Sequence, residues 1–304
     1  MEQKKPSLES TLKSSDTEEF IDIHFYRPIG YRFALFFQKT GVTPNAVTVA
    51  SIFIGIASGV FFYFDNIWMT LLGIFFLVWA NAFDSTDGQL ARMTRNFSPF
   101  GRALDGFAGD LWFASIYIAI CLRLMPVFGF WIWILAAAAG YFHSKQAAMA
   151  DYYRNIHLLF LKGKSGSELD NSIELTEKYK HETFHNNWFN KIYLFFYREY
   201  TKGQEGWTPN FQKMFGKLKE KFGENYPDSF RNDFRKKSLP LMKWTNILSF
   251  NTRAIVLFIS MLIGHPWIYF VFELTVLNII LVYMVHTHEK ICKDFTRQIE
   301  AGAY

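Results

Sequence analysis

The feature that most constrains this chain is a series of long apolar runs, each of about twenty residues and nearly free of charge. A helix needs about that many apolar residues to cross ~30 Å of hydrocarbon. Lipid offers the backbone no hydrogen-bond partners, so the runs are predicted to be helices; a barrel would show short alternating strands instead. The sequence therefore predicts an all-α integral membrane protein with six transmembrane helices. The six predicted spans lie near residues 44–63, 67–92, 100–122, 128–151, 245–263 and 267–287.

Polar segments divide the chain into four predicted parts. Residues 1–39 are expected to be a cytoplasmic N-terminus with an amphipathic interfacial helix that begins at Pro28, although a helix packed in the interior fits the same pattern. Residues 40–154 hold the first four spans, and residues 244–304 hold the last two spans and a tail. The polar stretch 155–243 is too long for a connector and is predicted to be a cytoplasmic helical insert on the membrane surface.

The distribution of charge predicts the orientation and limits the partners. Lysine and arginine gather in the loop between spans two and three, after span four and in the C-terminal tail, which predicts that this side and both termini face the cytoplasm. In a bacterium this would be the inner membrane. The net charge of +5 fits anionic lipid head groups or a phosphorylated substrate, and no nucleic acid is expected as a partner. The two cysteines, Cys121 and Cys292, do not indicate a disulfide framework.

Carboxylates inside the second and third spans carry the strongest functional signal, because charged residues in membrane helices are costly and mark function by default. Asp84 and Asp87 are three residues apart and share a face of one helix. A short turn at 96–99 is expected to fold Asp105 back beside them. Converging carboxylates repel each other unless cations lie among them, and their oxygens suit Mg²⁺ or Mn²⁺. Two such ions could bridge a pyrophosphate.

Small residues surround these carboxylates. Gly88 and Ala91 would let a bulky group approach the helix backbone, and Arg92 could grip a phosphate in bidentate fashion. Gly101 and Gly106 are expected to let the third span pack closely on the second. The alternative is that these polar and small residues only mediate helix packing.

Seven of these positions have a fixed spacing, D-x-x-D-G-x-x-A-R followed by eight residues and G-x-x-x-D. They are Asp84, Asp87, Gly88, Ala91, Arg92, Gly101 and Asp105. The pattern resembles the signature of the CDP-alcohol phosphotransferases. The segment Thr43–Thr48 is similar to the start of that family's first transmembrane helix, so the resemblance covers roughly residues 40–125.

The resemblance implies a fold, a reaction and a set of site residues. Members of the family have six transmembrane helices and form homodimers. They transfer a substituted phosphate from a CDP-linked donor to the hydroxyl of a polar or lipid alcohol, with release of CMP. By position, Asp84, Asp87 and Asp105 would hold two Mg²⁺ or Mn²⁺ ions. The residues expected at the nucleotide and phosphate are Asp84, Gly88, Ala91, Arg92 and Gly101.

One position departs from the family pattern, which ends in a carboxylate at the position of Gly109. The family uses that carboxylate as a metal ligand and as the base for the acceptor hydroxyl. Asp110 follows Gly109, but a shift of one residue rotates a side chain by about 100°. A π-bulge between Asp105 and Asp110 would return Asp110 to the site as catalytic base and metal ligand. Alternatively His143 or a water molecule is the base, or the protein is inactive.

Three basic residues at the ends of later spans are predicted to bind the acceptor, namely Lys145, Arg154 and Arg253. Arg253 lies inside an apolar run and should face a cavity, where a phosphate would be a natural partner. Lys145 and Arg154 could instead extend to lipid head groups. Glu273 is interpreted as a packing or dimer residue.

Together these features favour an integral membrane transferase of phospholipid or phosphosphingolipid biosynthesis with its active site on the cytoplasmic side. The sequence does not decide whether donor or acceptor carries the lipid, and the basic residues slightly favour a phosphorylated polar acceptor such as inositol phosphate. The alternative is a non-catalytic, nucleotide-binding membrane scaffold that has lost turnover through Gly109. A transporter is a more distant hypothesis, because the aspartates lie near one membrane face.

Overall fold

The computed structural model describes residue 8 and residues 14–304 of the chain. These residues form helices joined by turns and loops, and no β-strand occurs among them. The prediction of an all-α protein is therefore confirmed for the described part of the chain. Within the predicted N-terminal segment, residues 1–7 and 9–13 lie outside the description. The chain divides into two compact units that interleave along the sequence, and each is described by itself.

The first unit comprises Met1–Ser144 and Asn251–Thr275. It contains the motif and the candidate site. Its described elements are η2 (Asp22–Tyr26), α1 (Arg27–Thr40), α2 (Pro44–Tyr63), α3 (Ile67–Thr94), α4 (Pro99–Phe128), the first part of α5 (Trp131–Lys162), α10 (Phe250–Leu262), α11 (Trp267–Phe272) and the start of η4 (Glu273–Leu277).

The helices of the motif region begin and end where the local sequence directs. Thr43, Asn66 and Ser98 are the N-caps of α2, α3 and α4, and the side chain of each accepts a hydrogen bond from the first turn. Proline opens α2 and α4, where its fixed φ suits a helix and its missing N–H is not needed. Gly41 ends α1 at φ 75°, a left-handed conformation that glycine adopts without strain. These caps set the starting points of the helices that carry the aspartates.

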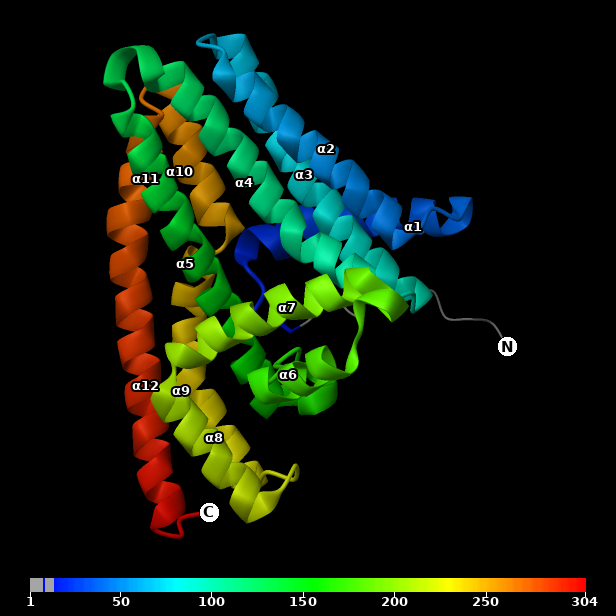
Figure 1. The fold of residues 1–304 in the computed structure, drawn as a ribbon, viewed down its shortest axis with the longest axis vertical. Helices are drawn as coiled ribbons and strands as arrows, with labels where there is room; N and C mark the ends of the chain where they lie inside the picture. Colours follow the sequence, from blue (N-terminus) through cyan, green and yellow to red (C-terminus); the bar gives the residue numbers. More distant parts are fainter. Residues whose placement is uncertain (1–7, 9–13) are drawn as a thin grey trace. The chain divides into compact units, whose positions relative to one another are not determined.

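Glycines on α2 allow its backbone to lie directly against α4. Helix α2 packs against both α3 and α4, and Figure 1 shows these helices side by side. A Cβ atom at Gly55 would lie 2.0 Å from the ring of Trp112, and one at Gly59 would lie 1.9 Å from the Oγ of Ser115. Because helices in lipid are held largely by van der Waals packing, such small residues decide how closely they approach.

Gly101 and Gly106, which were expected to lie between the second and third spans, have different neighbours in the structure. Gly101 faces Asn45 on α2, the first span, since a Cβ there would lie 2.4 Å from the Oδ1 of Asn45. A Cβ atom at Gly106 would meet no atom of a neighbouring element within 4 Å. The expectation that Gly101 and Gly106 pack the third span on the second is therefore wrong. The reason is that Gly101 lies against α2, whereas Gly106 is exposed.

Five helical segments of the described chain are long and apolar enough to cross a membrane. They are Pro44–Tyr63, Ile67–Thr94, Phe100–Phe128, Asp228–Leu262 and Trp267–Glu300. The remaining predicted span, at 128–151, falls on α5, which is not among them. The count of six spans is therefore not confirmed, whereas the apolar helices themselves are present.

Helix α1 corresponds to the predicted N-terminal amphipathic helix and begins one residue before Pro28. It packs against α3, with Ala34 buried in this contact region, while Phe36 on its other side is exposed. One face thus contacts protein and another is apolar and uncovered. The interfacial position of α1 stays a prediction.

The second unit comprises Lys145–Phe250 and Val276–Tyr304. Its elements are the remainder of α5, η3 (Lys164–Gly166), α6 (Ser172–His181), α7 (Phe184–Gly206), α8 (Pro209–Phe222), α9 (Asp228–Ile247) and α12 (Asn278–Glu300). The predicted insert 155–243 is thus helical, and its location relative to a membrane stays a prediction.

Closely packed aromatic rings form the core of the second unit, where α12 packs against α8 and α9. The ring of Phe160 lies 4.4 Å from that of Phe234, which in turn lies 5.6 Å from Phe295. Glu289 on α12 accepts hydrogen bonds from the backbone N–H groups of Asn210, at 2.6 Å, and Phe211, at 3.2 Å. A carboxylate at this position satisfies the open N–H groups of α8 and complements its dipole.

Candidate active site

The three motif aspartates converge on one point of the first unit. Asp84 and Asp87 project from α3 and Asp105 from α4, and each offers a carboxylate oxygen within 4.8 Å of the others. Asp87 is buried, Asp84 is half-buried and Asp105 is exposed. Such a set of oxygens has the chemistry and spacing that a hard divalent cation requires. The three residues that the sequence analysis grouped by spacing are therefore brought together.

Thr48 on α2 holds the buried member of this group. Its Oγ1 donates a hydrogen bond of 2.6 Å to Oδ2 of Asp87 and lies 3.1 Å from the carbonyl oxygen of Pro44. Partners of this kind orient a ligating carboxylate and raise the affinity of a metal site. Sequence reasoning gave Thr48 no role, although the residue lies in the Thr43–Thr48 segment that contributed to the family resemblance.

The turn between α3 and α4 returns Asp105 to Asp84 and Asp87. Arg95 ends α3 at φ 53°, and Ser98 then caps α4 by accepting the N–H of Gly101 at 2.9 Å. Asn45 donates to the Oγ of the same serine at 3.4 Å. A side chain at position 101 would collide with Asn45. Glycine at this position therefore preserves the tight turn.

Arg92 is the basic residue among the seven motif positions. Its Nε and Nη2 atoms are buried and have no hydrogen-bond partner among the described residues. A Cβ atom on Gly88, one turn earlier, would lie 3.5 Å from the guanidinium, so the glycine leaves room beside it. Ala91 is half-buried on the same helix. Unpaired buried N–H groups are costly, which makes this guanidinium ready to receive an anion.

Asp110 does not join the other aspartates. The α4 helix is α-helical from Pro99 to Phe128, so the expected π-bulge between Asp105 and Asp110 is wrong. Gly106 and Gly109 would have permitted a bulge, but the helix runs through both positions without one. Asp110 is exposed.

His143 belongs to a buried polar network that connects α4, α5, α10, α11 and η4. Arg253 places Nη1 2.6 Å from both carboxylate oxygens of Glu273 and 3.0 Å from Nδ1 of His143. The same Nδ1 lies 3.3 Å from Oε1 of Glu273 and 3.2 Å from the hydroxyl of Tyr117. Tyr269 donates to Oε1 of Glu273 at 2.6 Å. All five side chains are buried.

This network gives Arg253 a partner within the protein, and its assignment to the acceptor stays a prediction. A phosphate was predicted as its partner, whereas the partner in the structure is Glu273. Burial explains the pairing, because an arginine that is 1% exposed must meet an opposite charge inside the protein. Sequence reasoning missed Glu273, Tyr117 and Tyr269 as members of a polar network. The one available signal was a lone acidic residue and a lone basic residue in consecutive apolar runs.

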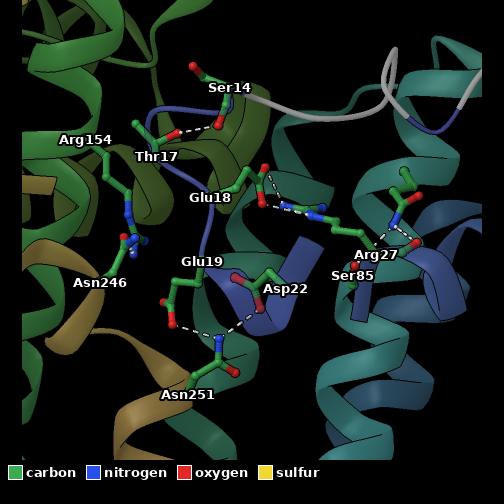
Figure 2. Close-up of polar contacts among 11 residues, drawn as sticks. Ser14, Thr17, Glu18, Glu19, Asp22, Arg27, Ser85, Arg154, Asn246 and Asn251 are labelled. Carbon is green, nitrogen blue, oxygen red and sulfur yellow. Dashed lines mark hydrogen bonds and ion pairs between the residues drawn. The ribbon is translucent and has the colours of Figure 1, made fainter. Parts of the chain in front are cut away.

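The other two predicted acceptor residues lie in the second unit. Arg154 donates hydrogen bonds to Asn246, at 3.0 Å, and to Ser249, and Figure 2 shows Arg154 beside Asn246. The Nζ of Lys145 would lie 3.8 Å from a Cβ atom on Gly203. Arg154 thus has partners within its own unit. The assignment of both residues to the acceptor stays a prediction.

A comparison of the chain with known protein families matches the region that carries these aspartates. Residues 41–154 match the family model described as CDP-alcohol phosphatidyltransferase, which covers α2, α3, α4 and most of α5. A comparison with curated proteins gave no match. The apolar helices together with this family indicate an integral membrane protein. Residues 41–154 of this chain are therefore a CDP-alcohol phosphatidyltransferase domain.

Proposed function

We propose that the protein is a membrane-embedded CDP-alcohol phosphotransferase of phospholipid or phosphosphingolipid biosynthesis. It would transfer a substituted phosphate from a CDP-linked donor to an acceptor hydroxyl and release CMP. The observation that carries this proposal is the convergence of Asp84, Asp87 and Asp105 within the family domain. The proposal further includes a homodimer and a cytoplasmic active site, for which the family resemblance and the basic loops are the support.

The donor set fits Mg²⁺ or Mn²⁺, because all of its atoms are carboxylate oxygens. Asp84, Asp87 and Asp105 would hold the metal, and two ions would neutralise the charge of the donor pyrophosphate. The hydrogen bond from Thr48 would keep the carboxylate of Asp87 oriented for binding the metal together with Asp84 and Asp105. Arg92 would bind a phosphate oxygen through its unpaired Nε and Nη2 atoms. The chain itself thus binds and orients the donor.

In the transfer step, the acceptor oxygen forms a bond to the β-phosphorus, and the bond from that phosphorus to the bridging oxygen of CMP breaks. The hydroxyl proton must pass to a base. We propose two candidates for this base, of which the first is Asp110, a carboxylate on α4 that lies outside the group of Asp84, Asp87 and Asp105. His143 is the alternative, because its polar contacts with described residues are all made through Nδ1. Nδ1 can either accept from Arg253 or donate to Glu273, and only the tautomer that donates to Glu273 would leave Nε2 able to accept the proton.

The direct test is release of CMP by the purified full-length protein in lipid nanodiscs. CDP-diacylglycerol, CDP-choline and CDP-ethanolamine would each be offered with a panel of acceptor alcohols, in Mg²⁺, Mn²⁺ or EDTA. We expect turnover only with a divalent ion and a loss of at least about a hundredfold in Asp84→Asn and Asp105→Asn. Asp65→Asn, in the exposed α2–α3 loop, is the matched control. Full activity of Asp84→Asn would refute the metal-site assignment.

Two variants separate the bases. If Asp110 takes the proton, Asp110→Asn loses CMP release by about a hundredfold or more while CDP binding is retained. If His143 takes it, His143→Asn has this effect and Asp110→Asn does not. Equal rates for both variants and the wild type would leave a water molecule as the proton acceptor and contradict both assignments.

A second candidate function has one observation in its favour. Position 109 lacks the carboxylate of the family, and regular α4 geometry keeps Asp110 out of the aspartate group. A scaffold that binds the nucleotide without turnover would show CDP binding but no CMP release with any acceptor. CMP release with one acceptor would exclude it.

A further inference from the structure

A buried ion pair lies next to the nucleotide motif, outside the seven motif positions. Arg27, the first residue of α1, donates from Nε and Nη2 to the two carboxylate oxygens of Glu18, each at 3.1 Å. The side chains are 16% and 5% exposed, so the pair is largely removed from solvent. Figure 2 shows the two side chains turned toward each other. A bidentate arginine–carboxylate pair of this kind is a strong and geometrically specific contact.

Contacts with α3 hold Arg27 on the face that carries Arg92. The backbone oxygen of Arg27 accepts a hydrogen bond of 3.1 Å from Nε2 of Gln89. Gly30, one turn further along α1, lies so close that a Cβ atom there would be 2.8 Å from the same nitrogen. Gln89 and Arg92 are three residues apart and therefore share one helix face. The charges of both Arg27 and Glu18 act on the Arg92 guanidinium.

The backbone of Arg27 thus lies against the face of α3 that carries Arg92, and the two guanidinium groups are close enough for their like charges to interact. One of them, Arg27, has a carboxylate partner, whereas Arg92 keeps two buried N–H groups without a partner among the described residues. Two neighbouring arginines repel each other unless an anion lies between or beside them. A phosphate offers more acceptor oxygens than one carboxylate and can accept from two arginines at once. The cluster thus has the donors that a phosphate group would use.

We propose that Arg27 and Arg92 together bind a phosphate group of the substrate, and that Glu18 is an internal anion which the phosphate displaces from Arg27. The inference rests on the proposed function, because Arg92 belongs to the nucleotide motif. The shared chemistry is a phosphate, which either the pyrophosphate of the CDP-linked donor or a phosphorylated acceptor can supply.

Neighbouring contacts allow Glu18 to move without unfolding its segment. Glu19 and Asp22 accept hydrogen bonds from Nδ2 of Asn251, at 2.8 Å and 3.0 Å. Figure 2 shows both carboxylates converging on this amide. Side chains that follow Glu18 therefore anchor this segment to the start of α10. Glu19 also provides a matched control, since it carries the same charge one residue away.

The test measures binding by calorimetry with the purified full-length protein and three probes, which are CDP with Mg²⁺, CMP with Mg²⁺, and glycerol 3-phosphate in the presence of CMP. We expect Glu18→Gln to tighten phosphate binding at least about threefold, because a competing anion is removed. Arg27→Gln should weaken it about tenfold or more, as expected for loss of a hydrogen bond to a charged group. Glu19→Gln should bind like the wild type.

The probes identify the source of the phosphate. Effects on CDP but not on CMP would assign the site to the second phosphate of the donor, whereas effects on glycerol 3-phosphate would assign it to a phosphorylated acceptor. If Arg27→Gln folds poorly because Glu18 is left unpaired, the double variant Glu18→Gln/Arg27→Gln removes that cost. This double variant should bind the phosphate probe about tenfold more weakly than Glu18→Gln does.

Two results would overturn the inference, and they are distinguishable. If Glu18→Gln and Arg27→Gln bind every probe like the wild type while Arg92→Gln loses CDP, the Glu18–Arg27 pair is only structural and the proposed function stands. If the wild type binds none of the three probes, the inference and the proposed function fail together.

Discussion

Removal of Arg253 should be among the most destabilising single changes in the first unit. The guanidinium is 1% exposed and lies 2.6 Å from both oxygens of Glu273, which is itself fully buried. In Arg253→Met the Glu273 carboxylate keeps Tyr269 as a donor but loses its compensating charge. Breaking a buried pair from one side costs about 3–5 kcal/mol, because an isolated charge is left in a medium of low dielectric constant. We expect a loss of that size in the free energy of unfolding.

The double variant Arg253→Met/Glu273→Leu tests the reason for this cost. Replacing both charges by apolar side chains of similar volume removes the unpaired charge and is often close to neutral. We therefore expect the double variant to be more stable than Arg253→Met by at least about 2 kcal/mol. Unfolding by titration with SDS in mixed micelles, followed by circular dichroism, measures each free energy.

Ser260→Ala provides a control on the same helix. Ser260 is buried in α10 and donates to the carbonyl oxygen of Leu257, at 2.8 Å, so its loss should cost about 1 kcal/mol. The reasoning is refuted if Arg253→Met costs no more than Ser260→Ala. It is also refuted if the losses in the free energy of unfolding for Arg253→Met and for Glu273→Leu simply add in the double variant.

Three smaller changes test the packing and the metal site. Thr48→Val removes the hydroxyl that donates to Asp87, and we expect Mn²⁺ affinity, measured by calorimetry, to fall about tenfold or more; unchanged affinity would mean that the hydroxyl does not orient the carboxylate. Gly59→Ala places a methyl group against Ser115 and should cost about 1–3 kcal/mol in SDS unfolding. Gly106→Ala adds the same methyl group where no neighbouring atom lies within 4 Å, so it should be neutral or stabilising by up to about 1 kcal/mol. Equal effects of the two glycine substitutions would contradict the packing described for α2 and α4.

Part of the site could be predicted from the sequence because it depends on local geometry. Asp84 and Asp87 share a face of any helix that contains them, since their spacing is three residues. The turn that returns Asp105 is only a few residues long, and Ser98 at its end is a typical N-cap followed by proline. The identity of the three converging carboxylates therefore did not depend on how the remaining helices pack.

Other parts of the site depend on which helix faces meet, and spacing along one helix does not contain that information. Thr48 and Asp87 are 39 residues apart and meet only because α2 packs on α3. Arg253 was expected to bind a phosphate, because its charge indicated an anionic partner but not which anion. The regular course of α4 past Asp110 is likewise a property of the packed helix, since glycines permit a bulge without requiring one.

The sequence by itself determined that the chain forms apolar helices and that carboxylates gather in one motif. The physical reason is that a backbone in lipid must satisfy its hydrogen bonds within its own segment, and that residues three apart on a helix lie together. Only the tertiary structure decided the partners of the buried charges, namely Glu273 for Arg253 and Glu18 for Arg27. These pairings follow from contacts between separate helices, where the cost of burying a charge selects whichever opposite charge the packing brings near.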